Sequence, residues 1–521
     1  GVIGDADEAV KIAGQIGYPV MIKASAGGGG KGMRIAHSAA EVKDGFTRAK
    51  SEAKSSFGDD RVFLEKFIVN PRHIEIQVLG DKHGNIIHLG ERECSIQRRN
   101  QKVVEEAPSP LLDAKTRAAM GTQAVALAKA VGYDSAGTVE FVAGQDKSFF
   151  FLEMNTRLQV EHPVTELITG IDLVEQMIRV AAGEKLAIKQ GDVTFKGWAI
   201  ESRIYAEDPY RGFLPSTGRL VKYRPPAEQN DNGITVRNDT GVQEGGEISI
   251  WYDPMIAKLC THAPTRGDAI LAMASALDGF YIDGIRHNVP FLSAIMQVPR
   301  WITGTLSTGF IAEEFPDGFH GAALTPELSE RMAKVATILD HIENRRKRKI
   351  DNQMNGHVGR HAAQRAVRLG KEWRDAEVTA ETDYIADQCG WFPGVPVFRG
   401  EISGQDVTVQ VRPILNGYRL SHHGVVIDAY VFNSREAELV RLMPENVAAD
   451  TSKKLLCPMP GLVIAISVGE GQEVKAGDAL AIVEAMKMEN ILRAERDVTV
   501  KKVNAKKGDS LAVDAVIMEF A

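Results

Sequence analysis

The spacing of hydrophobic positions changes several times along the chain, and each change predicts a new kind of element. Helical spacing runs from Asp5 to Ile16, and a strand at 20–23 follows the turn Gly17-Tyr18-Pro19. The stretch 92–102 is so basic and polar that it is unlike any core strand. Alternation of polar and apolar residues predicts further strands at 34–36, 63–68, 72–78, 137–141 and 151–159.

The pattern after residue 320 predicts a different architecture. Residues 326–374 read as helical and turn strongly basic, whereas 377–443 read as short alternating strands separated by turn signals. A helix followed by such a meander predicts a small barrel around a helix. The basic segment could bind nucleic acid, but a solvated helix or a subunit contact is the favoured interpretation.

Two similar half-units predict a flattened β-sandwich at 455–521. Each half carries a glycine-containing turn phrase, at 468–478 and at 503–509, and a single lysine, Lys487, stands at their junction. Apolar alternation on both sides of Lys487 places this residue at the tip of a hairpin. An ordinary exposed hairpin lysine is the plain alternative.

Composition narrows the function classes. The chain has 521 residues, of which 44% are hydrophobic and 25% charged, so it is long enough for three or four domains. A formal net charge of −7 gives no general reason to expect nucleic acid or a membrane as partner. The four cysteines show no metal-ligand spacing, so neither a disulfide framework nor a zinc site is predicted.

A glycine-rich stretch is the first candidate for ligand binding. Five of the six residues from Gly27 to Gly32 are glycine, and the stretch lies between a strand carrying Lys23 and another strand. Such a backbone can approach a ligand closely and cradle phosphate oxygens with its N–H groups. The spacing does not fit the Walker A pattern, and a flexible linker is the alternative interpretation.

The densest candidate chemistry lies between 137 and 163. On a strand, alternate residues would share one face, and a neighbouring strand would add Glu140. Oxygen ligands of this kind suit Mg²⁺, and an arginine offers a planar fork for a carboxylate-like anion. A structural row of ion pairs is the less favoured alternative. The four residues of the row are Glu153, Asn155, Arg157 and Gln159.

Motifs in both halves of the chain resemble one family. Ala485-Met486-Lys487-Met488, with Pro458-Met459-Pro460-Gly461 before it, resembles the attachment motif of biotinyl domains; lipoyl domains usually set their lysine beside other residues. The glycine lid and the motifs across 1–320 resemble the biotin carboxylase branch of the ATP-grasp proteins. The chain is thereby identified as a member of the biotin-dependent acyl-CoA carboxylases, as their α subunit.

The resemblance implies a multidomain α+β fold. Residues 1–320 would form an ATP-grasp biotin carboxylase domain with its C-terminal subdomain, lacking the amino-terminal α/β subdomain that the family carries earlier. Residues 326–445 would form a helix-plus-barrel docking domain, 446–454 a linker and 455–521 the biotinyl carrier.

The resemblance also implies roles for individual residues. Glu161 would be the base that deprotonates bicarbonate, Arg203 would stabilise the enolate of biotin, and Phe213 would line the biotin pocket; His162 is expected to be a structural partner. Arg157, Gln159 and Val160 would hold bicarbonate, and Glu140, Glu153 and Asn155 would bind Mg²⁺ or Mn²⁺. The ATP site would comprise Lys23, Gly28, Gly29, Gly30, Glu65, Lys66, His73, Gln97 and Asn100, although relatives often carry histidine at the position of Asn100. Biotin would be attached to Lys487.

The implied reaction needs partners. Bicarbonate would attack ATP to give carboxyphosphate, and the resulting CO₂ would be transferred to biotin. The residues between the two recognised ends are too few for a carboxyltransferase, so a crotonase-like β subunit that binds acyl-CoA is expected in a hetero-oligomer, and a biotin protein ligase would attach biotin. Neither nucleic acid nor a membrane is expected as partner. The compartment would be the cytoplasm in bacteria or the mitochondrial matrix in eukaryotes.

The acyl acceptor is left open at this point. The stretch 435–445 resembles family members that convert propionyl-CoA to methylmalonyl-CoA. Carboxylases of 3-methylcrotonyl-CoA or acetyl-CoA would share all these sequence features with this chain except those of residues 330–450. A non-catalytic biotin carrier would need none of Glu140, Glu153 and Glu161.

Overall fold

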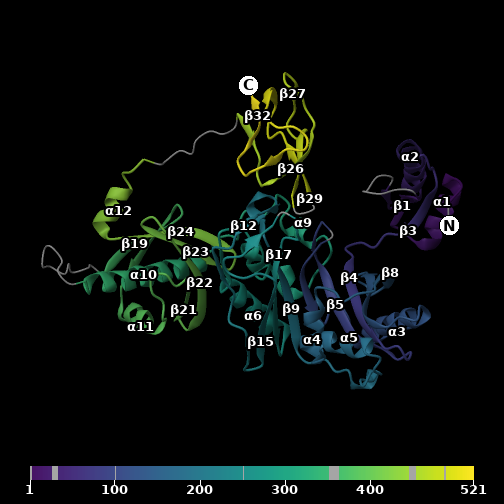
Figure 1. Ribbon diagram of the computed structural model, residues 1–521, viewed down its shortest axis with the longest axis horizontal. Coiled ribbons are helices and arrows are strands. Elements are labelled where there is room, and N and C mark those ends of the chain that lie inside the picture. Colours follow the sequence, from purple (N-terminus) through teal and green to yellow (C-terminus); the bar gives the residue numbers. More distant parts are fainter. Residues whose placement is uncertain are drawn as a thin grey trace.

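The chain folds into four parts that follow one another in the sequence (Figure 1). They are a small amino-terminal unit, a large sheet domain, a sheet curled about one long helix, and a β-sandwich. No described helix combines the length and the apolar composition needed to cross a membrane. The computed structural model describes residues 3–25, 33–99, 101–249, 251–350, 363–444, 453–485 and 488–521.

The amino-terminal unit pairs two helices with a three-stranded antiparallel sheet. Asp5 begins the first helix by accepting hydrogen bonds from the backbone N–H groups of Asp7 and Glu8, which would otherwise lack partners. The predicted helix and strand are confirmed. Gly28, Gly29 and Gly30 lie outside the described residues. The elements are α1 (Ala6–Ile16), β1 (Val20–Ala24), β2 (Met33–Ala36), α2 (Ala39–Phe57) and β3 (Val62–Lys66), with strand order β2-β1-β3.

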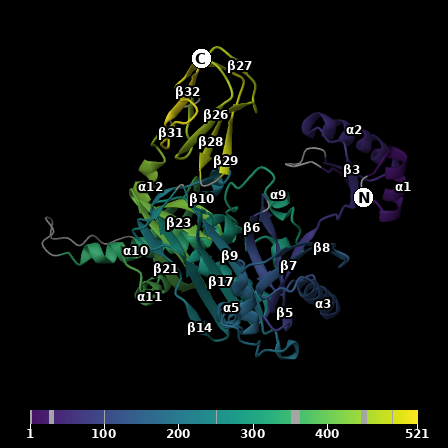
Figure 2. The ribbon, with the colours of Figure 1, turned by 45° about the vertical axis from the view of Figure 1, so that its right-hand side comes forward.

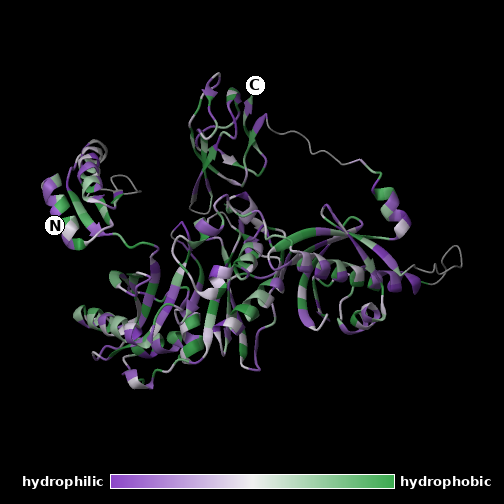
Figure 3. Cartoon of the chain, turned by 180° about the vertical axis from the view of Figure 1, so that it is seen from behind, coloured by the Kyte–Doolittle hydropathy of each residue, from purple (hydrophilic) through white to green (hydrophobic). Residues whose placement is uncertain are grey.

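A nine-stranded antiparallel sheet forms the middle of the molecule. Its strands are striped with hydrophobic and hydrophilic residues, because successive side chains point to opposite faces (Figure 3). The order is β14-β15-β17-β9-β6-β5-β4-β7-β8. The strands are β4 (Arg72–Gly80), β5 (Ile86–Arg98), β6 (Gln101–Ala107), β7 (Ser135–Ala143), β8 (Phe149–Asn155), β9 (Trp198–Tyr205), β14 (Gln229–Asp231), β15 (Ile234–Thr240) and β17 (Met255–Ala263).

Helices cover the sheet, and the polar face of the sheet lies beneath one of these helices, α4. α3 (Ala114–Ala130) packs its alanines on Ile74 and Ile76 of β4, whereas α6 (Arg266–Asp278) packs on β9 and β17. α4 (His162–Thr169) and α5 (Leu173–Ala181) complete the cover. The short elements around them are η1 (Gln190–Asp192), β10 (Glu207–Asp208), η2 (Pro209–Arg211), β11 (Leu214–Pro215), β12 (Gly218–Arg219), β13 (Lys222–Arg224), β16 (Glu247–Ile248), β18 (Tyr281–Asp283), α7 (Val289–Ile295), α8 (Pro299–Thr303) and α9 (Phe310–Glu314).

Two predictions for this sheet are wrong. The stretch 92–102 is not excluded from the core, because β5 and β6 run through it and residues such as Arg92 and Glu93 are buried. Their charges are tolerated because they pair with one another inside the sheet. The strand predicted at 151–159 ends at Asn155, so Arg157 and Gln159 lie in the following loop and do not continue a strand face.

The third part corrects the prediction of a helix over 326–374. The helix ends at Arg348, and 364–377 forms two strands, because alternate residues such as Val367 and Leu369 pack against the helix. Two helices, α11 and α12, also lie in the region 377–443 predicted to contain strands alone. The elements are α10 (Pro326–Arg348), β19 (Gln364–Leu369), β20 (Glu372–Glu377), α11 (Ala380–Gln388), β21 (Val397–Ile402), β22 (Gln405–Ile414), β23 (Gly417–His422), β24 (Val425–Phe432) and α12 (Ser434–Val440).

The strands of this part form one antiparallel sheet in the order β20-β19-β24-β23-β22-β21. The sheet curls about α10, whose buried residues Met332, Val335 and Leu339 join the core of the sheet. Pairing between its two end strands is absent from the described strand pairs, so the sheet is open and curled. Figure 2 shows this part beside the large sheet, with the sandwich above both.

The β-sandwich at the end of the chain is built from two interlocked halves. Its sheets have the orders β25-β32-β30-β27 and β29-β28-β26-β31. Shifting every strand by four positions exchanges the two sheets, so each half supplies two strands to each sheet, which confirms the two-half sandwich. The strands are β25 (Lys454–Leu456), β26 (Gly461–Ile466), β27 (Glu473–Val474), β28 (Ala479–Ala485), β29 (Met488–Arg493), β30 (Val498–Val503), β31 (Ser510–Leu511) and β32 (Val516–Phe520).

The hairpin predicted around the candidate lysine is present. β28 and β29 pair in antiparallel register, with Ala485 opposite Met488 at the end of the ladder. Lys487 itself lies outside the described residues, as do residues 446–452 of the predicted linker; β25 begins at Lys454, within the range predicted for that linker.

Candidate active site

The polar face of the large sheet begins on β4. His73, Glu75 and Gln77 are alternate residues and share the face beneath α4, as the sequence predicts. The His73 ring lies between two partners: its Nε2 is 2.9 Å from Glu140, and its Nδ1 is 2.7 Å from the Gln97 side chain. The ring is therefore fixed from both sides, with its edge at the Glu140 carboxylate of β7.

Arg92 of β5 anchors the buried end of this face. The guanidinium is fully buried and donates to Glu75 at 2.6 Å, to Gln77 at 2.7 Å and to Gln159 at 2.9 Å. Burial would raise the pKa of Glu75, but Arg92 and Lys102 outweigh it and lower the pKa to about 2. Glu75 is therefore ionised at neutral pH.

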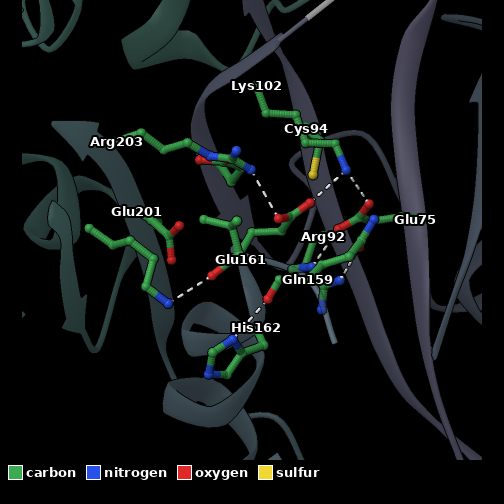
Figure 4. A network of polar contacts seen from close by, with 12 residues as sticks. Glu75, Arg92, Cys94, Lys102, Gln159, Glu161, His162, Glu201 and Arg203 are labelled. Atoms are coloured by element: carbon green, nitrogen blue, oxygen red, sulfur yellow. Dashed lines mark hydrogen bonds and ion pairs between the residues drawn. The ribbon is translucent and has the colours of Figure 1, made fainter. Parts of the chain in front are cut away.

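Lys102 of β6 connects Glu75 and Glu161 (Figure 4). Its Nζ is 2.5 Å from Glu75, 2.6 Å from Glu161 and 3.2 Å from Glu140. Burial would lower the pKa of Lys102, yet these carboxylates raise it above its ordinary value, so the side chain stays an ammonium. One cation thus holds three carboxylates at a common point.

The predicted metal ligands lie on two neighbouring strands. Glu140 of β7 is directly opposite Glu153 of β8, and Asn155 donates to Glu140 at 2.9 Å. Burial would raise the pKa of Glu140, but the hydrogen bond from His73 and the charge of Lys102 lower it to about 2. Two adjacent carboxylates, with Glu153 exposed, fit a hard divalent cation that also binds phosphate oxygens.

The predicted bicarbonate residues follow in the loop after β8. Arg157 is exposed, and its nearest polar contact is a hydrogen bond of 3.3 Å to Asn155, so most of its donors face outward. Gln159 is buried and donates to Glu140 at 2.9 Å. The carbonyl oxygen of Val160 accepts a hydrogen bond of 2.9 Å from Lys258 of β17. The loop is thus tied to both sides of the sheet.

Glu161 lies between this loop and α4, and two cations hold it. Lys102 contacts one carboxylate oxygen at 2.6 Å, and Arg203 of β9 contacts the other at 2.9 Å. Arg203 also donates to Glu105 at 2.5 Å, and its orientation is therefore fixed by two carboxylates. His162 contacts the Gln159 carbonyl at 2.9 Å, a contact that stabilises the turn (Figure 4).

Phe213 lies beside this region with an unusual backbone. Its φ is 63°, a left-handed value that is costly for a bulky residue and marks a position held by its surroundings. The Arg98 guanidinium lies 4.3 Å from the ring centre, and Phe291 packs edge-on at 4.8 Å. The aromatic side chain is therefore fixed under a cation.

The remaining predicted ATP residues lie on the separate amino-terminal unit (Figure 1). Lys23 and Glu65 form an ion pair of 2.5 Å across β1 and β3. The Lys66 ammonium donates to the carbonyls of Gly17 and Tyr18, each at 2.9 Å, at the end of α1. His73 and Gln97 thus lie on the large sheet, whereas Lys23 and Lys66 lie on the amino-terminal unit. Asn100 lies outside the described residues.

Sequence reasoning missed several members of the network. Lys102 stood at the end of a stretch predicted to lie outside the core, and Arg92 at its beginning. Glu105 and Glu201 are charges that directly follow apolar residues within strands, at Val103-Val104-Glu105 and Ala199-Ile200-Glu201. A charged residue that is buried in a strand needs a partner. The charges of Glu105 and Glu201 beside apolar strand residues could therefore have identified them as members of a buried network.

Family models match four consecutive parts of the chain. The matches are the carbamoyl-phosphate synthase L chain ATP-binding domain (residues 1–189), the biotin carboxylase C-terminal domain (201–313), the propionyl-coenzyme A carboxylase BT domain (332–446) and the biotin-requiring enzyme domain (453–520).

Curated relatives match over the whole chain. The propionyl-CoA carboxylase alpha chain of Ruegeria pomeroyi is 58% identical over 547 residues, covering 100% of this chain and 80% of that protein. The mitochondrial alpha chain of Homo sapiens is 48% identical over 535 residues, covering 100% of this chain and 73% of that protein. A mitochondrial methylcrotonoyl-CoA carboxylase alpha subunit of Rattus norvegicus is 40% identical, covering 99% and 74%.

Solved structures match the carboxylase part. The biotin carboxylase domain of a thermophilic 2-oxoglutarate carboxylase bound to bicarbonate is 47% identical, with a TM-score of 0.56 over 60% of this chain and 68% of that one. The biotin carboxylase subunit of pyruvate carboxylase is 49% identical, with a TM-score of 0.56 over 61% of this chain and 69% of that one.

The carboxylate-lined sheet and the carrier sandwich define a biotin carboxylase joined to a biotinyl carrier, an enzyme class that depends on ATP and biotin. The relatives include bacterial and mitochondrial proteins. The chain belongs to the family of propionyl-CoA carboxylase alpha chains. A carboxyltransferase beta subunit is the partner that this family implies, in a hetero-oligomer.

Proposed function

We propose that the chain uses ATP and bicarbonate to carboxylate biotin attached to Lys487, and that the carboxyl group then passes to propionyl-CoA on the partner subunit. The observation that carries this proposal is Glu161, held at 2.6 Å from Lys102 and 2.9 Å from Arg203. A carboxylate fixed between two cations beside an exposed arginine is a base placed where an anionic substrate would bind.

Glu161 is the group that takes the proton of bicarbonate. Bicarbonate becomes a competent nucleophile only after losing this proton. Arg157 has donors facing outward and binds the anion in a planar fork, with Gln159 and Val160 beside it. Lys102 orients the base and neutralises charge that gathers among the carboxylates.

Glu140, Glu153 and Asn155 are the residues that would hold Mg²⁺ or Mn²⁺. The ion supplies charge neutralisation on the phosphates of ATP. His73 and Gln97 fix one edge of this site, and Lys23, Glu65 and Lys66 bind ATP from the smaller unit together with the glycine stretch that contains Gly28, Gly29 and Gly30. Asn100 belongs to the same set.

Arg203 and Phe213 are the residues that would receive biotin. Arg203 places a guanidinium next to the base, where it stabilises negative charge on the ureido oxygen. Biotin supplies the nitrogen that becomes carboxylated. Lys487 is suited to the attachment of biotin, because it lies in the chain between Ala485 and Met488, the last pair of the β28–β29 hairpin.

Residues 326–445 are proposed to dock the partner subunit, a crotonase-like carboxyltransferase. The part is far larger than a tether requires, and its α10 is enclosed by a six-stranded sheet. Its match to a domain named for propionyl-coenzyme A carboxylase favours propionyl-CoA over 3-methylcrotonyl-CoA or acetyl-CoA. A biotin protein ligase attaches biotin, in the cytoplasm of a bacterium or the mitochondrial matrix of a eukaryote.

Purification of the full-length protein with its partner tests the proposal. Mass spectrometry should find one biotin adduct, on Lys487, and the complex should fix labelled bicarbonate on propionyl-CoA in the presence of ATP. Faster carboxylation of 3-methylcrotonyl-CoA would overturn the acceptor, and an adduct at another lysine would overturn the carrier assignment. A chain in which a flexible linker replaces residues 326–445 should stay biotinylated and lose the partner.

A further inference from the structure

A row of three buried side chains crosses the sheet next to Arg203. Glu105 of β6 is directly opposite Glu201 of β9, and Glu201 is directly opposite Cys260 of β17. All three are completely buried. Side chains directly opposite one another on adjacent strands lie on the same face, with Cβ atoms roughly 5 Å apart. Two carboxyl groups are thus neighbours in a site without water access.

The hydrogen bonds of this row are incomplete if both carboxyl groups are ionised. Glu105 accepts from Arg203 with one oxygen, Oε1, and its Oε2 has no partner. Glu201 accepts from the Cys260 thiol with Oε2 at 3.4 Å, and its Oε1 has no partner. Each glutamate therefore has one buried oxygen without a hydrogen bond, a costly arrangement for two ionised groups.

We propose that Glu105 and Glu201 share one proton, which Glu201 donates from Oε1 to Oε2 of Glu105, and that this pair positions Arg203 for the reaction proposed above. The single proton gives both unpartnered oxygens a partner and removes the repulsion between two buried carboxylates. It leaves Glu105 as the ionised member, with its other oxygen free to hold the guanidinium.

The surroundings favour a proton on this pair. Burial raises the pKa of Glu105 to about 7, and burial with the neighbouring Glu105 raises the pKa of Glu201 to about 8. Burial also raises the pKa of Cys260, so the thiol keeps its hydrogen and donates. The charged groups facing the pair are Arg203 on β9, Lys102 on β6, Lys258 on β17 and Glu161 before α4.

The Glu105–Glu201 pair keeps Arg203 oriented during the proposed reaction. When Glu161 takes the proton of bicarbonate, it becomes neutral and its attraction for Arg203 weakens. Glu105 remains ionised at that moment and keeps the guanidinium oriented. Glu201 is thus a positioning residue that acts through Glu105, and its own proton is not consumed.

Infrared spectroscopy of the full-length protein in complex with its partner tests the shared proton without relying on activity. At neutral pH the wild-type complex should show the C=O stretch of a protonated carboxyl group, which should be missing from Glu201→Gln. A spectrum without that band, or one unchanged by Glu201→Gln, would overturn the proposal. Because the band does not depend on turnover, it is independent of whether Arg203 binds biotin.

Kinetics of two variants test the positioning role. Glu201→Leu cannot donate to Glu105 and should lower kcat for biotin carboxylation about tenfold, with little change in the KM for ATP. Glu201→Gln donates through its amide and should restore the rate. The wild-type rate should decline as pH rises above about 8, the pKa of Glu201, whereas Glu201→Gln should keep its rate there. An alkaline limb that is the same in both proteins would contradict the positioning role.

Discussion

The large sheet and the carrier sandwich use charge in opposite ways. On the sheet, Lys102 is almost enclosed and contacts three carboxylates, each within 3.2 Å. On the sandwich, the ion pair between Lys475 and Asp497 is exposed, and apolar residues such as Val483 and Ile517 form the core. The difference teaches that one region fixes its proposed reactive groups through mutual contacts, whereas the other is proposed only to carry biotin on Lys487.

The first way to sharpen this comparison is to remove the presented lysine. Lys487→Ala should abolish biotin attachment and all transfer of carboxyl groups to acyl-CoA, because the carrier contributes this one group. Mass spectrometry and fixation of labelled bicarbonate check the result. The sheet should still cleave ATP when free biotin is supplied. Lys501→Ala, which changes an exposed lysine of the same domain, should keep the adduct.

The second test acts on Glu161, the residue that we propose as the base for bicarbonate. Glu161→Gln should lower bicarbonate-dependent ATP cleavage by roughly 10² to 10⁴ while nucleotide binding is retained, because the base is needed only for the chemical step. Calorimetric titration with nucleotide separates the two effects. Glu175→Gln, which changes an exposed side chain of α5, is the matched control and should be active. Wild-type rates in Glu161→Gln would remove this residue from the mechanism.

The third test breaks a buried pair. Arg92→Met should destabilise the large sheet by about 3–5 kcal/mol, because it leaves the buried Glu75 without its guanidinium partner. Hydrogen exchange of the β4 and β5 amides reports the change region by region. The double variant Arg92→Met/Glu75→Met should recover part of the loss. Unchanged exchange in Arg92→Met would show that Lys102 alone satisfies Glu75.

Acid should distinguish the regions further. The pKa of Glu75 and that of Glu140 each fall from 4.5 to about 2 in the folded chain. The folded pKa is the lower one, so this stabilisation is complete above pH 4.5 and is lost as the pH falls towards 2. Hydrogen exchange between these pH values should show the sheet opening before the sandwich, and simultaneous opening would contradict the expectation.

The smallest effect is expected on the sandwich surface. Lys475→Ala removes the exposed ion pair with Asp497, and the thermal unfolding of the carrier should stay within experimental error, because exposed pairs gain little in water. Calorimetry of the complex reports this transition. A clear destabilisation would mean that the carrier, like the sheet, depends on its charges.

Sequence reasoning succeeded where a local pattern fixes local structure. The alternation around Met488, the two turn phrases and the β4 row of His73, Glu75 and Gln77 each predicted the observed strand face or hairpin. It failed where tertiary contacts decide. Arg92 and Lys102 look like surface residues until the fold places Glu75 of the paired strand β4 and Glu161 of the turn before α4 beside them. The basic side chains of β19 similarly obscured its alternation of polar and apolar residues, so the sequence predicted a helix there.

The interlocked strand order of the sandwich sets a sequence of events for its folding. β25 pairs with β32, so the first and last strands of the domain are neighbours although the whole domain separates them in the chain. Contacts between distant residues form late, because a long loop must close first. Neither half can complete a sheet alone, and the sheet opposite the hairpin that contains Lys487 is complete only when β32 joins β25 to β30. A carrier interrupted before Val516 would therefore lack the complete opposite sheet, whose Ile517 and Met518 share a core with Leu480 and Val483 of the hairpin.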